Sequence, residues 1–144
     1  MTYPHQLLDD VKTLASFEGW SEEVYLDFFK MQRGEMSEVD FGKKYHQEHA
    51  ILAMDMTGYT RSTIQYGELD SFLRIMDAQR VVIPVLQKFG AQLIRCFADD
   101  VVALFSDPNA AIDAAFEVHH RTKLFNASPI ASCNPTQCCV GIGY

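Results

Sequence analysis

The chain has 144 residues, 48% of them hydrophobic, and this composition suits one folded domain with a core and excludes a disordered chain. The formal net charge of −7 argues against a protein that binds nucleic acid through its phosphates. It does not exclude a protein that binds a small anionic nucleotide, because a bound metal can reverse the local electrostatic field. No apolar run is long enough to cross a bilayer and no signal peptide is present, so we expect a cytoplasmic protein without a membrane partner and with reduced cysteines.

Residues 1–49 are polar and helix-prone, and we expect a separate N-terminal helical segment here. Ser21 is a typical N-cap, since Glu22 and Glu23 follow it in the first turn. Gly34 should end this helix, and residues 35–49 are expected to be a charged connector. The helix carries an apolar stripe that should pack on the rest of the domain or on a partner subunit, formed by Val24, Tyr25, Phe28 and Phe29.

Residues 50–144 alternate between strand and helix patterns and form the second expected domain. Strands are predicted over residues 50–55, 92–97, 100–105 and 138–144, and helices over about 69–89 and from Asp107-Pro108 to near Asn126. Pro84 predicts a kink or break in the first of these helices. The predicted buried faces consist of Phe72, Leu73, Met76, Ile83 and Leu86 in the first helix, and of Ala111, Ile112, Ala115, Phe116 and His119 in the second.

The resulting order β-α-β-β-α-β predicts an α+β fold of the ferredoxin-like, palm type. In this fold the first and third strands are central, so the end of strand one lies beside the turn between strands two and three. Asp55 and Asp99 should therefore converge. Two adjacent carboxylates repel unless a divalent cation lies between them, as in two-metal phosphoryl chemistry. Each also has a structural interpretation, Asp55 as the cap of a turn and Asp99 as a turn residue, and Asp100 is expected to be a solvated turn residue.

Two segments carry further motifs. The first runs from Met54 through Asp55, Gly58 and Tyr59 to Thr60, after a strand. The second runs from Gly90 through Asp99 to Phe105, across the predicted hairpin. Together the two segments resemble the catalytic domain of class III nucleotidyl cyclases. The resemblance implies that Asp55 and Asp99 hold two Mg²⁺ or Mn²⁺ ions together with the Met56 carbonyl.

The resemblance further implies that the backbone N–H groups of Thr57, Gly58, Tyr59 and Thr60 bind the phosphates of a nucleoside triphosphate. The implied reaction is in-line attack of the ribose 3′-hydroxyl on the α-phosphorus, giving a 3′,5′-cyclic nucleotide and pyrophosphate.

Two residues depart from the family pattern. Arg95 stands where the family carries a base-recognition residue, Lys in adenylate cyclases and Glu in guanylate cyclases. Because Arg donates but does not accept hydrogen bonds, it suits adenine or a pyrimidine better than guanine, and small bacterial pyrimidine cyclases are also similar to this chain. ATP is the default substrate, with UTP or CTP open. The alternative is that Arg95 only pairs with a nearby acid.

Ala98 replaces a Gly, which would strain the metal site if the turn needs a positive φ.

The resemblance covers the N-terminal part of the cyclase domain, so the Asn and Arg that stabilise the family's transition state cannot be assigned. It also implies a homodimer in which each subunit completes the partner's site. A non-catalytic nucleotide-sensing or dimerisation module is the second hypothesis. A diguanylate cyclase or polymerase relative is a third, against which the absence of a Gly-Gly-Asp/Glu-Glu-Phe turn counts.

Overall fold

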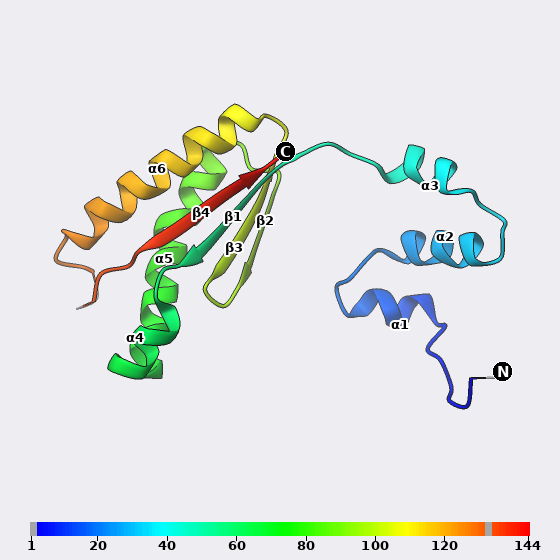
Figure 1. Cartoon of the computed structure of the whole chain (residues 1–144), viewed down its shortest axis with the longest axis horizontal. Coiled ribbons are helices and arrows are strands. Elements are labelled where there is room, and N and C mark those ends of the chain that lie inside the picture. Colours follow the sequence, from blue (N-terminus) through cyan, green and yellow to red (C-terminus); the bar gives the residue numbers. More distant parts are fainter. Residues whose placement is uncertain (1–2, 132–133) are drawn as a thin grey trace. The chain divides into compact units, whose positions relative to one another are not determined.

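The computed structural model describes residues 3–131 and 134–144, and these form two compact units that divide between Gln47 and Glu48 (Figure 1). The boundary predicted from the sequence lies two residues later, between residues 49 and 50. Cys96, Cys138 and Cys139 are free thiols, whereas Cys133 lies outside the described residues. Within the described ranges, none of the helices combines the length and the apolar character that crossing a bilayer requires.

The first unit consists of three short helices, α1 (Val11–Ser16), α2 (Glu22–Gln32) and α3 (Glu38–Tyr45). Each begins at a side-chain cap, and the caps are Asp10, Ser21 and Ser37. The predicted cap at Ser21 is confirmed. The prediction of a connector over residues 35–49 is wrong, because Ser37 accepts a hydrogen bond from the N–H of Asp40 at 3.1 Å and starts α3.

The apolar stripe of α2 packs inside this unit. Phe28 stacks on Phe41 of α3 with ring centroids 5.0 Å apart, and Trp20 meets Phe28 edge-on at 5.1 Å. Asp27 is fully buried beside them and accepts hydrogen bonds from Lys30, Lys44 and the Tyr45 hydroxyl, which hold the pKa of its carboxyl well below the usual range. A buried carboxylate thus ties α2 to α3.

The second unit is built on a four-stranded antiparallel sheet of β1 (Ala50–Met56), β2 (Leu93–Phe97), β3 (Asp100–Phe105) and β4 (Cys138–Gly143). The strand order is β2-β3-β1-β4, so the predicted α+β, ferredoxin-like fold with β1 and β3 at the centre is confirmed. Figure 1 shows β1 between β3 and β4. Side chains of β1 alternate between buried and exposed, so only one face of the sheet packs against helices of this unit.

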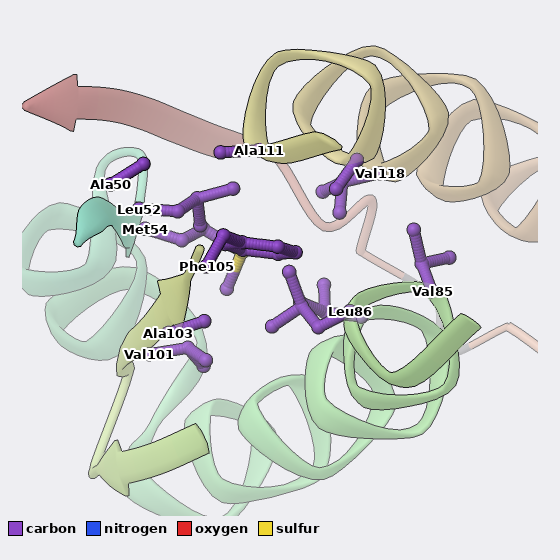
Figure 2. Packing of buried hydrophobic residues seen from close by; sticks show 12 residues of the cluster. Ala50, Leu52, Met54, Val85, Leu86, Val101, Ala103, Phe105, Ala111 and Val118 are labelled. Atoms are coloured by element: carbon purple, nitrogen blue, oxygen red, sulfur yellow. The ribbon is translucent and has the colours of Figure 1, made fainter. Parts of the chain in front are cut away.

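The core lies between that face and two helices, α5 (Glu68–Lys88) and α6 (Pro108–Asn126). Figure 2 shows Leu52, Met54 and Phe105 pointing from the strands towards Leu86 of α5 and Val118 of α6. The predicted start of α6, with Asp107 as cap and Pro108 in the first turn, is confirmed.

Of the kink or break predicted at Pro84, the break is wrong, since α5 runs through this residue, and the kink stays a prediction. Proline costs about 3 kcal/mol inside a helix, but each fully buried Val or Leu side chain returns about 1.5–3 kcal/mol. The surrounding residues Val82, Val85 and Leu86 are all buried, so the packing outweighs the proline.

The predicted helix faces are wrong in part. In α6, Ala111 is buried as predicted, but Phe116 is 73% exposed and small residues such as Ala114 face the sheet, which lets the helix approach closely. In α5, Leu86 is buried as predicted, whereas Phe72 is 59% exposed. In the first half of α5 the buried side chains are polar, because they form hydrogen bonds inside the protein. For example, the hydroxyls of Ser71 and Thr63 lie 2.7 Å apart.

An additional helix, α4 (Tyr59–Tyr66), precedes α5 and was not predicted as a separate element. Gly67 separates the two helices with φ +93°, a conformation that other residues rarely adopt. The Thr63 to Ser71 contact joins α4 to α5 across this break.

Candidate active site

Three carboxylates meet at one edge of the sheet. Oxygen atoms of Asp55, Asp99 and Asp100 all lie within 4.8 Å of one another. Asp99 is half-buried and the other two are exposed. The convergence of Asp55 and Asp99 follows from the topology, as the sequence pattern predicts, and Asp100 joins them.

The strand register explains this convergence. Met54 is paired with Val101, so the next residue of β1, Asp55, lies across from Asp100. Phe97 is paired with Asp100, and this leaves Ala98 and Asp99 as a two-residue hairpin turn. Ala98 has φ 51°, in the left-handed region, so the turn does require the conformation for which glycine is usual.

The cluster is electrostatically unfavourable without a cation. Partial burial, together with the neighbouring Asp55 and Asp100, raises the pKa of the Asp99 carboxyl. Carboxylate and backbone carbonyl oxygens are the hard ligands that Mg²⁺ and Mn²⁺ prefer, and Met56 lines the same cavity. The donor set therefore fits the divalent ions that the resemblance implies.

The carboxylates open into a cavity of about 470 Å³, whose other side is the loop before α4. Gly58 has φ +72° and precedes the first residue of α4, and no side chain caps this end. Unpaired N–H groups and the helix dipole favour an anion at such an end. Gly58, Tyr59 and Thr60 all line the cavity, where the resemblance implies phosphate contacts.

Thr57 lies differently from the other loop residues. Its N–H donates a hydrogen bond to the Gln137 carbonyl at 2.8 Å, and the residue lines other cavities instead of this one. The segment before β4 therefore already uses the Thr57 N–H, and the phosphate contact expected from it stays a prediction.

Arg61 is a cavity residue that the sequence analysis missed. The sequence did contain a signal for it. Arg61 comes three residues after Gly58, so it is a cation in the first turn of α4, next to the place expected for the phosphates.

Arg95 lies outside the carboxylate cavity, in the middle of β2. It is paired with Val102, two residues along β3 from Asp100, so it shares the sheet face that carries Asp55 and Asp100. Its side chain is exposed, and Nη1 donates to the Ile94 carbonyl at 3.1 Å. Among the described residues, no acidic side chain is paired with Arg95. The alternative prediction, that Arg95 only pairs with a nearby acid, therefore has no support there.

The sequence matches no family model and none of the curated proteins. Among solved structures, a bacterial light-regulated adenylyl cyclase is similar with a TM-score of 0.58 and 15% identity, over 65% of this chain and 51% of that chain. The adenylyl cyclase CyaB from P. aeruginosa has a TM-score of 0.53 and 17% identity, over 65% of this chain and 54% of that chain.

A further structure of a bacterial light-regulated adenylyl cyclase is similar over 96% of this chain and 44% of that chain, with a TM-score of 0.58 and 12% identity. The chain thus spans about half the length of these cyclases. The comparison shows that the fold is of the adenylyl cyclase type.

Proposed function

We propose that the protein is a metal-dependent nucleotidyl cyclase, which converts a nucleoside triphosphate to a 3′,5′-cyclic nucleotide and pyrophosphate. The observation that carries the proposal is the meeting of Asp55, Asp99 and the Gly58 loop in one cavity, from three separate elements of a cyclase-type fold. In the reaction the 3′-oxygen bonds to the α-phosphorus, the bond to the β-phosphate oxygen breaks, and the hydroxyl proton leaves to solvent.

Asp55, Asp99 and the Met56 carbonyl would hold two Mg²⁺ or Mn²⁺ ions. Bound ions of this kind lower the pKa of the ribose 3′-hydroxyl and neutralise the triphosphate. The N–H groups of Gly58, Tyr59 and Thr60 hold the phosphates, and Arg61 adds a positive charge on the same side of the cavity.

Arg95 is the proposed base-recognition residue. It lies on the same sheet face as Asp55, and its guanidinium offers donors only. Ring nitrogens of adenine or carbonyl groups of a pyrimidine accept from such a group, so ATP is the default substrate, with UTP and CTP as alternatives.

A homodimer with composite sites is the proposed assembly. The face of the sheet that carries Arg95 also exposes apolar side chains, among them Phe97, which is 66% exposed, and Ile51 and Leu93. An exposed apolar face beside a nucleotide site suits a second copy, whose residues would complete that site.

The test is incubation of the protein with each of the four ribonucleoside triphosphates and Mn²⁺, with products identified by mass. We expect one cyclic nucleotide and pyrophosphate, and loss of both in Asp55→Asn and Asp99→Asn. Asp113→Asn, which removes an exposed carboxylate from α6, is the matched control and should retain activity. Full turnover in either site variant would reject the metal assignment.

A non-catalytic nucleotide-binding or dimerisation module is the second candidate. It is favoured by the exposed apolar side chains of Ile51, Leu93 and Phe97, since such a face suits dimerisation with or without turnover. Calorimetry with Mn²⁺ and each triphosphate separates the two candidates, since tight binding without any cyclic product supports the module.

A further inference from the structure

We propose that a second cavity, beside the Gly58 loop and distinct from the carboxylate cavity, binds a small oxyanion through Arg74. This Arg74 cavity is lined by Arg74 of α5, by Thr57, Gln65 and Tyr66, and by Asn134 and Gln137 ahead of β4. The inference concerns binding and does not depend on the proposed cyclase activity.

The first argument is the state of the guanidinium. Arg74 is only 3% exposed, and its Nε donates to Asp70 at 3.0 Å. Its Nη2 is buried and has no hydrogen-bond partner among the described residues. Arg stays charged at any accessible pH, and a buried N–H of a charged group without an acceptor is strongly unfavourable. Because the described residues offer no acceptor to this N–H, a ligand in the cavity that accepts a hydrogen bond from it would relieve the penalty.

The second argument is the chemistry of the cavity wall. Its described lining includes amide and hydroxyl side chains, on Gln65, Tyr66, Asn134 and Gln137, and Arg74 is its one charged residue. Asp70 stands outside the lining, and its two oxygens already accept from Arg74 and from Asn134. Asp70 balances the charge of Arg74 through Nε, so the wall offers the remaining guanidinium N–H groups and polar side chains, which together suit an anion that accepts several hydrogen bonds.

The third argument is size. The Arg74 cavity holds about 180 Å³, less than the roughly 300–1,000 Å³ typical of sites for drug-sized ligands. Because one water takes about 30 Å³ in the liquid, the space admits a small oxyanion and a few waters. A nucleoside triphosphate is excluded, which leaves a phosphate-like or carboxylate-like group.

The cavity also adjoins the Gly58 loop. Thr57 and Gln137 both line it, and the N–H of Thr57 donates to the Gln137 carbonyl at 2.8 Å. An oxyanion in the cavity therefore braces the link between the end of β1 and the segment before β4.

The test is calorimetric titration of the whole chain with inorganic phosphate, in EDTA and at constant ionic strength set with NaCl. EDTA removes divalent ions, so phosphate cannot be held at the carboxylates through a metal. A parallel titration with acetate distinguishes a phosphoryl from a carboxylate ligand. We expect saturable binding of one equivalent of at least one of the two.

The principal variant is Gln65→Glu, which adds a carboxylate at an exposed lining position and leaves Arg74 in place. It should weaken binding at least about tenfold, a difference of about 1.4 kcal/mol. Gln87→Glu is the matched control. Gln87 is exposed and lies about 20 Å from Arg74 along α5, so this variant should bind like the unmodified chain. Arg74→Gln should abolish binding. If Arg74→Gln does not fold, the result for Gln65→Glu decides the test.

Absence of binding to the unmodified chain would overturn the proposal, since water alone then fills the cavity. Binding that persists unchanged in Gln65→Glu would also overturn it, because the ion would then occupy another place, such as the Gly58 loop. Failure of the cyclase proposal leaves these measurements unaffected, as they involve neither a metal nor turnover.

Discussion

Replacing Asp99 by Asn should stabilise the metal-free protein. Its carboxylate lies within 4.8 Å of Asp55 and of Asp100, and Coulomb's law gives about 0.9 kcal/mol of repulsion for two unit charges at this distance in bulk water. Two such neighbours give about 1–2 kcal/mol. Asn keeps the shape and removes the charge, so the free energy of unfolding in EDTA should rise by that amount.

The assay is urea unfolding at pH 7, followed by circular dichroism, in EDTA and in Mn²⁺. Mn²⁺ should stabilise the unmodified chain and have much less effect on Asp99→Asn, so that the order of stability reverses when the metal is added. Asp113→Asn controls for the change of net charge and should shift neither curve by more than about 0.5 kcal/mol.

The pH dependence has a defined sign. Burial and the neighbouring carboxylates raise the pKa of Asp99 above its ordinary value of 3.8, so the ionised group destabilises the fold at neutral pH. This penalty is lost as the pH falls through the raised pKa towards 3.8, and the advantage of Asn should shrink accordingly. An Asp99→Asn variant that is less stable than the unmodified chain in EDTA, or that gains equally from Mn²⁺, would refute the reasoning.

Three further outcomes are expected. Ala98→Gly should raise the free energy of unfolding by about 1 kcal/mol in urea, because the φ of 51° strains Ala, and an unchanged midpoint would count against a strained turn. Leu86→Ala should cost about 2–5 kcal/mol in the same assay, whereas the exposed Phe116→Ala should cost less than about 0.5 kcal/mol, and equal losses would contradict the core assignment. Asp27→Asn should loosen the N-terminal unit, measured by the fluorescence of Trp20. In the unmodified chain that stabilisation should be present above pH 4 and lost below it, since the pKa of Asp27 is lowered, and an acid-insensitive signal would contradict this.

The strands and the hairpin could be predicted from local signals. Apolar, β-branched runs mark the strands, and a spacing of two residues between two of them fixes the turn that carries Asp99. The meeting of Asp55 and Asp99 follows, because the ferredoxin-like topology admits one strand order. Their roles as metal ligands remain a proposal.

The helix faces were not predictable by hydrophobicity alone. Ser71 and Arg74 lie inward because Thr63 and Asp70 bond to them, and such partners come from tertiary structure. Three helices, α1, α3 and α4, were missed for a different reason. Their local signals are the caps Asp10 and Ser37 and the break at Gly67, and each stands in a polar segment where apolar periodicity is weak.

The central position of β1 has a consequence for the order in which we expect the sheet to form. Both neighbours of β1 come later in the chain, β3 at Asp100–Phe105 and β4 at Cys138–Gly143, so this strand has no local partner. The β2–β3 hairpin closes over two residues and is the segment best suited to nucleate. During synthesis, one edge of β1 therefore stays unpaired until β3 has emerged, and the other until β4 has emerged. Because high contact order slows folding, we expect β1 to be the segment through which an incomplete chain aggregates.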